Sequence, residues 1–222
     1  MGRPRQRPAA VFADRRDAGR RLGELLYAGE RALVVALPRG GVPVGFEVAS
    51  SLGLALDVLA VRKLGAPGNP ELAVGAIAEG GARVLEPRIA DRAGVTKESL
   101  EQIVARETLE LRRQAELFRG SRPPLDPLGR RVIAVDDGLA TGLTMLAAVE
   151  ALRERDAASI TVAVPVGARE SLELLRAHAD EVVCHTRPEH LLAVGAWYQN
   201  FDPVSDEEVM ALLRAGELTP RS

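Results

Sequence analysis

Residues 131–145 read RVIAVDDGLATGLTM and join three local signals. The apolar run 132–135 has the length and the β-branching of a strand that is buried on both faces. Two carboxylates, Asp136 and Asp137, follow the run at once. The small residues 138–142 come next, and a helical pattern begins directly after them. The sequence therefore predicts a buried strand, a tight loop and a helix in immediate succession.

A loop that leaves the carboxyl end of a strand and enters a helix is suited to binding an anion. The first N–H groups of the helix, predicted over 143–153, have no partner within it, and the helix dipole adds partial positive charge. Thr141 and Thr144 add hydroxyl donors. The acid pair, Asp136 and Asp137, would repel a bare phosphate, whereas a ribose phosphate also offers hydroxyl groups. The pattern therefore favours a sugar phosphate over a tight turn that binds nothing.

Three other motifs fit this stretch less well. The nucleotide-binding P-loop ends in Gly-Lys-Ser/Thr, but here Gly142 is followed by Leu143. The dinucleotide fingerprint Gly-x-Gly-x-x-Gly is not formed by Gly138 and Gly142. A phosphoryl-accepting aspartate at Asp136 is a third alternative, which is disfavoured because no lysine follows Lys97. The ligand prediction therefore depends on the acid pair and the two threonines.

The stretch 132–145, VIAVDDGLATGLTM, resembles the phosphoribosyl diphosphate (PRPP) motif of the type I phosphoribosyltransferases. That motif is an apolar run, two acids and a small-residue loop that ends in Thr-Gly-x-Thr. The resemblance implies that Asp136 and Asp137 hold the ribose hydroxyls and that residues 139–144 hold the 5′-phosphate. The implied PRPP-binding residues are Arg39, Gly40, Gly41, Arg62, Lys63, Asp136, Asp137, Gly138, Leu139, Ala140, Thr141, Gly142, Leu143 and Thr144.

A second strand–loop–helix unit lies near the start of the chain. The apolar run 32–37 is followed by PRGG at 38–41 and by a helical pattern over 42–52. Alone, this loop is explained equally well as a simple turn. Beside a PRPP motif it resembles the family's pyrophosphate loop, in which a non-proline cis peptide turns N–H groups toward the diphosphate. We predict such a bond at Arg39–Gly40 or next to it, although it costs roughly 3–4 kcal/mol.

Two cations, Arg62 and Lys63, follow the apolar run 56–61 at a predicted strand end, where α/β proteins bind ligands. Solvated charges at a sheet edge are the alternative. A diphosphate needs such cations, and the resemblance places them near it. Residues 64–71 are rich in glycine and proline and resemble the family's mobile loop, which would exclude water on closure. The residues predicted to take part in catalysis are Asp136, Asp137, Arg39 and Lys63.

The alternation of strand and helix patterns predicts an α/β fold. We expect one domain over residues 1–222, with a parallel twisted sheet flanked by helices. Residues 1–10 form a loose basic leader, residues 88–121 a helical insertion over one side of the sheet, and residues 186–203 a small hood. The insertion is also a candidate surface for a homodimer. The remaining predicted elements are helices over 14–28, 168–177 and 208–215, strands over 159–165 and 181–185, and a hairpin over 73–86.

The hood segment gathers aromatic residues that could stack on a flat base. Trp197 and Tyr198 are the candidate acceptor-binding residues. A hydrophobic cluster under the final helix explains them equally well. Many family members that act on 6-oxopurines have an acid before the Thr-Gly as general base, whereas this chain has Ala140. That difference argues against hypoxanthine or guanine as acceptor, and Glu71 is the remaining candidate base.

Charge and composition exclude several classes of function. A net charge of −2 gives no global attraction for nucleic acid or an acidic surface. Cys184 is the single cysteine, which excludes an internal disulfide and fits a reducing cytoplasm. The apolar run 32–37 is too short to cross a bilayer. We therefore expect a cytoplasmic protein with small-molecule ligands and no membrane or nucleic-acid partner.

The resemblance implies that the chain is an enzyme, a phosphoribosyltransferase. In such an enzyme a nitrogenous acceptor attacks C1 of PRPP, and pyrophosphate leaves with Mg²⁺ as the cofactor. No residue is assigned as a direct metal ligand, because ligand oxygens and water carry most of the coordination of Mg²⁺. The alternative is a regulatory protein of the same fold that senses PRPP or a nucleotide without turnover.

Overall fold

The computed structural model describes residues 10–27, 29, 32–120, 122–123 and 125–217. The predicted leader over 1–10 lies outside these residues except for Ala10. In chain order, the helices and strands are α1 (Arg15–Gly23), β1 (Leu33–Ala36), α2 (Gly41–Leu52), β2 (Ala55–Val58), β3 (Val61–Ala66), β4 (Asn69–Ala78), β5 (Arg83–Leu85), α3 (Pro87–Arg92), α4 (Lys97–Arg119), β6 (Arg131–Val135), α5 (Leu143–Arg153), β7 (Ser159–Val166), α6 (Arg169–Arg176), β8 (Glu181–Thr186), a 3-10 helix η1 (Val194–Trp197) and α7 (Asp206–Glu217).

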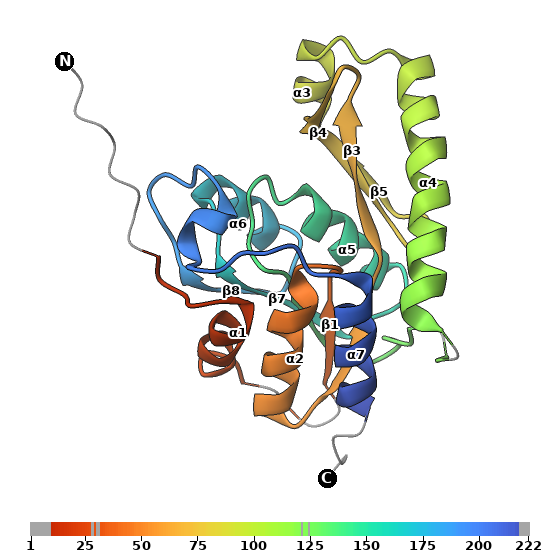
Figure 1. Cartoon of the computed structure of the whole chain (residues 1–222). Helices are drawn as coiled ribbons and strands as arrows, with labels where there is room; N and C mark the ends of the chain where they lie inside the picture. Colours follow the sequence, from red (N-terminus) through yellow and green to blue (C-terminus); the bar gives the residue numbers. More distant parts are fainter. Residues whose placement is uncertain (1–9, 28, 30–31, 121, 124, 218–222) are drawn as a thin grey trace, which may run out of the picture.

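The central sheet has five parallel strands in the order β2-β1-β6-β7-β8. Successive side chains of a strand point to opposite faces. On β1, Val34 and Ala36 pack in one buried cluster with α2 and α7, and Leu33 and Val35 pack in another with α5 and α6. Helices thus cover both faces of the sheet (Figure 1). The predicted α/β fold with a helix-flanked parallel sheet is confirmed.

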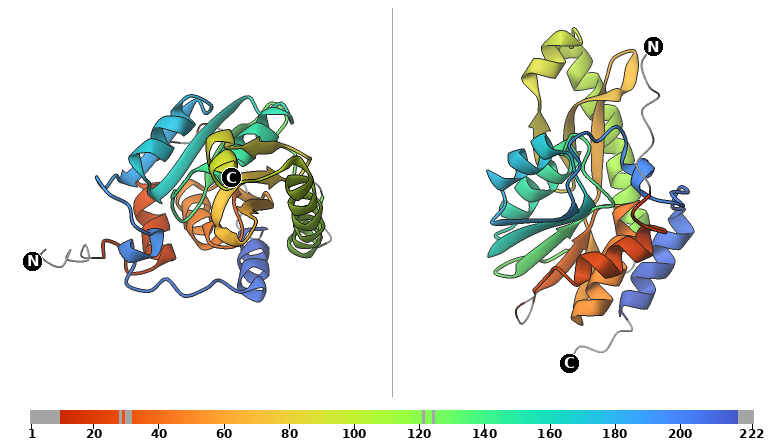
Figure 2. Two further views of the ribbon diagram at one scale, coloured as in Figure 1. Left: turned by 90° about the horizontal axis from the view of Figure 1, so that it is seen from above. Right: turned by 90° about the vertical axis from the view of Figure 1, so that its left-hand side faces the viewer.

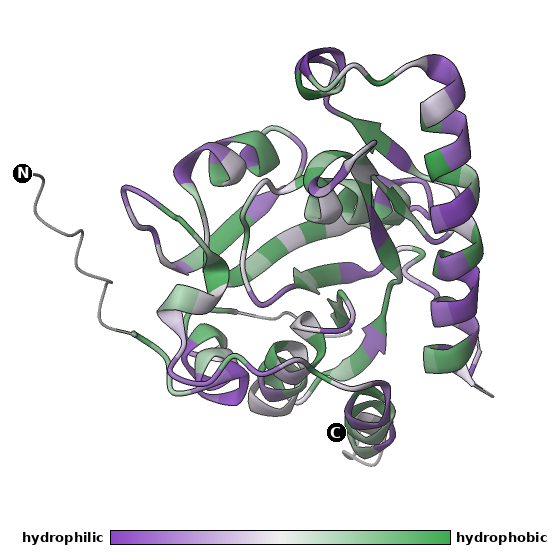
Figure 3. Ribbon diagram, turned by 45° about the horizontal axis from the view of Figure 1, so that its top comes forward, coloured by the Kyte–Doolittle hydropathy of each residue, from purple (hydrophilic) through white to green (hydrophobic). Residues whose placement is uncertain are grey.

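A second sheet, with the antiparallel order β3-β4-β5, rises beside the central one together with α3 and α4 (Figures 1 and 2). We call residues 61–119 the arm. One face of the arm's sheet packs on α4 through Leu64, Val74 and Ile103, and the other face packs on α5. The opposite side of α4 is largely hydrophilic (Figure 3). The predicted insertion is therefore two helices, and they cover mainly this small sheet, while the end of α4 reaches the parallel sheet through Phe118.

Local signals set most helix starts. Asp14 caps α1 by accepting the N–H of Asp17 at 2.8 Å, as expected from the sequence. Ser205 does the same for α7 by accepting the N–H of Glu208 at 3.1 Å. The helix α1 ends at Gly23, earlier than the predicted residue 28. Among the described residues, no helix is both long and apolar enough to span a bilayer.

Candidate active site

The two predicted ligand loops meet at the carboxyl edge of the central sheet, because β1 and β6 are neighbouring strands. The N–H of Leu37 donates to the carbonyl oxygen of Val135 at 2.9 Å, so the segments that follow β1 and β6 leave the sheet side by side. A Cβ on Gly41 would lie 2.7 Å from that same carbonyl oxygen, and a Cβ on Gly40 would collide with the Asp137 carboxylate. Only glycine allows the PRGG loop to lie this close to the acids.

The peptide between Pro38 and Arg39 is cis, and Arg39 is not a proline. The bond adjoins Arg39–Gly40, so the prediction of a non-proline cis peptide there or next to it is confirmed. The predicted helix over 42–52 is confirmed as α2, which begins at Gly41. The PRGG segment therefore connects β1 directly to a helix N-terminus beside the acid pair.

The acid pair is held in a cramped, largely enclosed position. The N–H of Asp137 donates to Oδ1 of Asp136 at 2.8 Å. Burial, followed by the negative charge of Asp137, raises the pKa of Asp136 well above its usual range. Burial also raises the pKa of Asp137, while the Arg15 guanidinium opposes that rise. Two acids with little solvent favour a ligand that brings hydroxyl donors to them.

The loop after the acid pair is pinned to the neighbouring strand. The N–H of Leu139 donates to the carbonyl oxygen of Val166, and the carbonyl oxygen of Leu139 accepts from Ala168, both at 2.9 Å. The hydroxyl of Ser171 donates to the carbonyl oxygen of Ala140 at 2.5 Å. The strand β7 and the helix α6 therefore set the course of the loop.

The loop ends at Gly142, the N-cap of α5, which has a φ of +77° that favours glycine. The helix α5 begins at Leu143, and its first-turn N–H groups have no partner within the helix. Thr141 is exposed and Thr144 half-buried at this helix start. The predicted strand, loop and helix are confirmed, and they form an anion cradle beside two acids.

The predicted cations all form ion pairs within the chain. Arg39 Nη lies 3.5 Å from Oδ1 of Asp206, a buried oxygen atom that has no hydrogen-bond donor among the described residues. Arg62 donates twice to the buried Glu107, at 3.0 and 2.8 Å. The Nζ of Lys63 lies 3.1 Å from the carboxylate of Glu71. The three pairs differ in how firmly they hold the cation.

Arg62 and Lys63 do not lie at the end of a parallel strand, so that prediction is wrong. The strand β2 ends at Val58, and both cations lie inside β3 of the antiparallel sheet. Residues 64–71, expected to form a mobile loop, belong mostly to the β3–β4 hairpin in this structure. The pairing shifts register around Gly65, which hides the strand pattern in the sequence.

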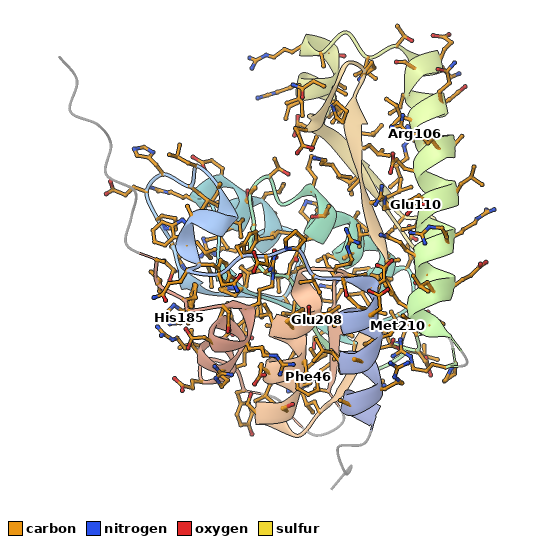
Figure 4. All side chains as sticks on the ribbon, in the orientation of Figure 1. Phe46, Arg106, Glu110, His185, Glu208 and Met210 are labelled. Atoms are coloured by element: carbon orange, nitrogen blue, oxygen red, sulfur yellow. The ribbon has the colours of Figure 1, made fainter. Side chains whose placement is uncertain are left out.

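The neighbours Arg62 and Lys63 point to opposite faces of β3. Arg62 pairs across the sheet with Ile77 on the α4 face, and Lys63 pairs with Ala76 on the α5 face. In Figure 4, Arg106 and Glu110 lie along α4. Arg106 also donates to Glu107, at 3.1 Å, so the partner of Arg62 is doubly paired.

The charge of Arg39 acts on Glu110 of α4, as does the charge of Arg62. The pKa of Glu110 is lowered chiefly by a hydrogen bond from Arg113, with smaller contributions from the charges of Arg62 and Arg39. The pairing of Arg39 with Asp206 is long, and 48% of the Arg39 side chain is exposed. Arg39 and Lys63 are therefore available to a ligand at lower cost than Arg62.

The hood segment does not present Tyr198 for stacking. The ring is buried, and its hydroxyl donates to the carbonyl oxygen of Asp137 at 2.6 Å. Burial and the nearby charge of Asp137 raise the pKa of the phenol. The predicted role of this ring in acceptor binding is not supported in this conformation, because no face of it is open.

The aromatic cluster lies under the N-terminal segment and not under the final helix. The Tyr198 ring lies 5.3 Å from that of Phe12, which in turn lies 5.2 Å from His185 beside α1 (Figure 4). Trp197 is half-buried at the end of η1, and its carbonyl oxygen accepts the N–H of Phe12 at 3.0 Å. The hood segment thus pairs with the first residues of the described chain.

Sequence reasoning missed Arg15, whose Nε donates to Oδ2 of Asp137 at 2.8 Å. The two residues are 122 positions apart, and no local pattern distinguishes this arginine from Arg16. Phe201 belongs to the aromatic residues expected in the hood segment, but its position under the Arg15 guanidinium was not predicted. Within the described residues, no group of three or more His, Cys, Asp or Glu side chains could hold a metal ion.

This fold and this site define a class: an α/β protein with an acid pair and an anion cradle at the carboxyl edge of a parallel sheet. The family model for the phosphoribosyl transferase domain matches residues 6–196. The chain belongs to this family.

Two relatives come from Mycobacterium tuberculosis. They are named "Putative phosphoribosyl transferase MT0597" (strain CDC 1551 / Oshkosh) and "Putative phosphoribosyl transferase Rv0571c" (strain ATCC 25618 / H37Rv). Each is 45% identical over 205 residues, which cover 91% of this chain and 46% of the relative. The chain thus spans about half the length of these curated relatives.

Among solved structures, TT1426 from Thermus thermophilus is similar over nearly the whole fold. It is 46% identical, the TM-score is 0.76, and the match covers 91% of this chain and 97% of that one.

Proposed function

We propose that the protein transfers ribose 5-phosphate from PRPP to a nitrogenous acceptor and releases pyrophosphate, with Mg²⁺ as cofactor. One observation carries the proposal: the acid pair adjoins the free N-terminus of α5 at the edge of the central sheet. This juxtaposition offers acceptors to sugar hydroxyls and donors to a phosphate within one short segment.

The sugar phosphate occupies the strand–loop–helix unit over residues 131–153. Asp136 and Asp137 accept the ribose hydroxyls, and the backbone of residues 139–144 surrounds the 5′-phosphate, with Thr141 and Thr144 as hydroxyl donors. Support comes from the pinned loop and from the start of α5, where the first-turn N–H groups have no partner within the helix. Because the cradle is mostly backbone, it is formed before the ligand arrives.

The diphosphate lies toward the PRGG loop and the arm. Gly40 and Gly41 let the PRGG loop lie against the acids, and Arg39 and Lys63 supply positive charge. Both cations would exchange an exposed or long ion pair for a charge-assisted bond to phosphate. Arg62 contributes mainly through the field of the cluster, since Glu107 already holds it.

In the reaction, an acceptor nitrogen attacks C1 of the ribose as the bond to the diphosphate breaks. Positive charge develops on the sugar ring and negative charge on the departing diphosphate. The acid pair lies beside the former, and Arg39, Lys63 and the loop N–H groups stabilise the latter. These groups do not have to reorganise when the charge develops, which lowers the barrier.

Mg²⁺ would neutralise the diphosphate and make it a better leaving group. The described residues fit a metal that is carried by diphosphate oxygens and water, because they supply two acids and no larger ligand cluster.

The acceptor is a small nitrogenous base that does not need an acid at position 140, where this chain has alanine. Trp197 remains the candidate for stacking on it, because its side chain is only half-buried. Glu71, the candidate general base, has a 91% exposed side chain and would have to leave Lys63 to act. We also propose a cytoplasmic location, which fits the single buried thiol of Cys184.

A protein that senses PRPP or a nucleotide is the second candidate. The observation that favours it is the absence of an acid at Ala140 together with the pairing of Glu71 to Lys63. Such a protein would keep the cradle and the acid pair and would lack turnover.

Pyrophosphate release separates the two candidates. The full chain is incubated with PRPP, Mg²⁺ and a panel of purine, pyrimidine and other nitrogenous acceptors, and released pyrophosphate is measured. Release that depends on one acceptor supports the transferase. Binding of PRPP by calorimetry without release for any acceptor supports the sensor. Absence of PRPP binding contradicts the transferase and a sensor of PRPP.

A further inference from the structure

We propose that Arg15 is a positioning residue for the acid pair, which holds the Asp137 carboxylate in the orientation that accepts a ribose hydroxyl. The inference rests on the proposed function, because it assigns a role within the same sugar-phosphate site. The key observation is that the first residue of α1 reaches the carboxyl edge of the central sheet. Arg15 acts through Asp137 and has no contact of its own with the reacting atoms.

The Arg15 side chain is fixed by contacts on several sides. Its Nε donates to Asp137 at 2.8 Å, and one Nη donates to the carbonyl oxygen of Asp202, also at 2.8 Å. Its Cζ lies 3.8 Å from the ring centroid of Phe201. Only 12% of the side chain is exposed. A guanidinium with hydrogen bonds along its edge and an aromatic ring on its face has little rotational freedom. Its position is therefore fixed, and it sets the orientation of the Asp137 carboxylate.

The helix α1 gives this arginine a rigid base. Asp14 caps the helix through the N–H of Asp17. Gly19 lies so close to α2 that a Cβ there would be 2.6 Å from the carbonyl oxygen of Val44. The helix α2 begins within the PRGG segment, on the proposed diphosphate side of the site. Since α1 packs on α2, Arg15 links the acid pair to that helix as well.

Asp137 is held from a second direction by the hood segment. The Tyr198 hydroxyl donates to its carbonyl oxygen, and the Tyr198 ring lies 4.9 Å from that of Phe201. Phe201 therefore contacts both of the groups that hold Asp137. We call Arg15, Tyr198 and Phe201 the bracket.

The bracket makes the two acids unequal. Asp137 has a cation at hydrogen-bond distance, whereas no salt bridge within the described residues reaches Asp136. The positive charge favours the ionised, hydrogen-bond-accepting form of Asp137, which its burial opposes. Loss of the guanidinium should therefore weaken recognition of the sugar hydroxyls more than recognition of the phosphate.

Two sugar phosphates test this role by calorimetry with the full chain: ribose 5-phosphate and its 2-deoxy or 3-deoxy analogue. The wild type should prefer ribose 5-phosphate. Arg15→Gln should lose roughly tenfold in affinity for it and most of the preference. Arg15→Lys keeps the charge without the fork of donors. It should recover part of the affinity for ribose 5-phosphate and part of the preference over the deoxy analogue. A side chain that only stabilised the fold would change the two affinities equally.

Arg16→Gln is the matched control, because it makes the same substitution at the next position of α1. Arg16 pairs with Glu47 at 3.0 Å, and 46% of its side chain is exposed. This variant should bind both sugars like the wild type. Tyr198→Phe removes the other hold on Asp137 and should reduce the preference to a smaller extent, so the test continues if Arg15→Gln does not fold.

Unchanged affinity and preference in Arg15→Gln, or an equal loss for both sugars, would overturn the positioning role. Failure of the wild type to bind any of these sugar phosphates or PRPP would instead overturn the proposed function. The two failures are therefore distinguishable.

Discussion

The edge of the central sheet and the arm contribute to the site in different ways. At the sheet edge, the groups that face the ligand are two acids and a backbone loop pinned by β7 and α6. The arm offers Lys63, a single long side chain whose partner, Glu71, is almost fully exposed. The first region is built before the ligand binds, whereas the second has a cation that can change partners.

This difference indicates where binding energy should be concentrated. Groups that are already fixed lose little entropy on binding, while a flexible lysine must be ordered for each contact. Substitutions at the sheet edge should therefore cost more activity than substitutions in the arm. Four predictions, in order of decreasing effect, test this ranking.

Asp136→Asn and Asp137→Asn should each lower PRPP-dependent turnover roughly 100-fold or more, because each removes a charged acceptor at the reacting sugar. Pyrophosphate release measures the effect. Asp156→Asn is the matched control, since Asp156 is exposed in the turn after α5 and its φ of 58° also suits asparagine. Near-normal turnover in both acid-pair variants would remove the sheet edge from the mechanism.

Lys63→Met should weaken PRPP binding roughly tenfold, because one cation near the diphosphate is lost. Arg62→Met should keep PRPP affinity within about threefold of the wild type and lower the free energy of unfolding by about 1 kcal/mol, since Glu107 is left with Arg106 alone. Calorimetry and urea unfolding separate the two effects. A larger loss of binding in Arg62→Met would mean that the α4 face of the arm meets the ligand.

Gly142→Ala should lower the free energy of unfolding by about 1–2 kcal/mol, because alanine is strained at a φ of +77°. It should also weaken PRPP binding, since a Cβ there lies 3.1 Å from that of Ser171 and would shift the cradle. Gly53→Ala provides the comparison, because its φ is +65° and nothing lies near the added Cβ. That variant should lose similar stability and bind PRPP normally. Equal binding by both variants would show that the cradle tolerates movement.

The smallest effect concerns pH and stability. The pKa of Asp136 is higher in the folded chain than in the unfolded chain, where it is about 4. Above pH 4 the folded chain therefore holds more protons, and this group's contribution to stability falls as the pH rises toward the folded pKa. Asp136→Asn removes that loss, so its Tm should exceed the wild-type Tm by a few degrees more at pH 7.5 than at pH 4.5, a shift of about 2–4 °C for each 1 kcal/mol. A constant difference across this range would mean that Asp136 is not enclosed as described.

The sheet edge was predictable because its signals are local. Residues 131–153 contain, in order, the strand, the acid pair, the small-residue loop and the helix. Each of these segments has a hydrophobic periodicity or a residue composition of its own. The PRGG loop was predictable for the same reason once a PRPP motif stood beside it. Prediction of these backbone segments therefore succeeded.

The arm and the bracket were not predictable from local patterns. The strand β3 pairs with β4, and the register of the pairing shifts around Gly65. The glycine and proline residues in this hairpin are typical of a loop in the sequence. Tyr198 and Asp137 are 61 positions apart, and their contact depends on how the hood segment crosses the sheet edge. A residue whose role is to hold another residue leaves no periodic signal in the sequence.

The bracket has a consequence for the order of events during synthesis. Residues through Thr186 complete all five strands of the central sheet, but Tyr198, Phe201 and Asp202 are translated later. A chain still attached to the ribosome can thus hold all five strands while Asp137 remains unrestrained, although α7, which covers one face of the sheet, also follows later. The restraint on Asp137 is therefore added after the strands that carry both loops have been made.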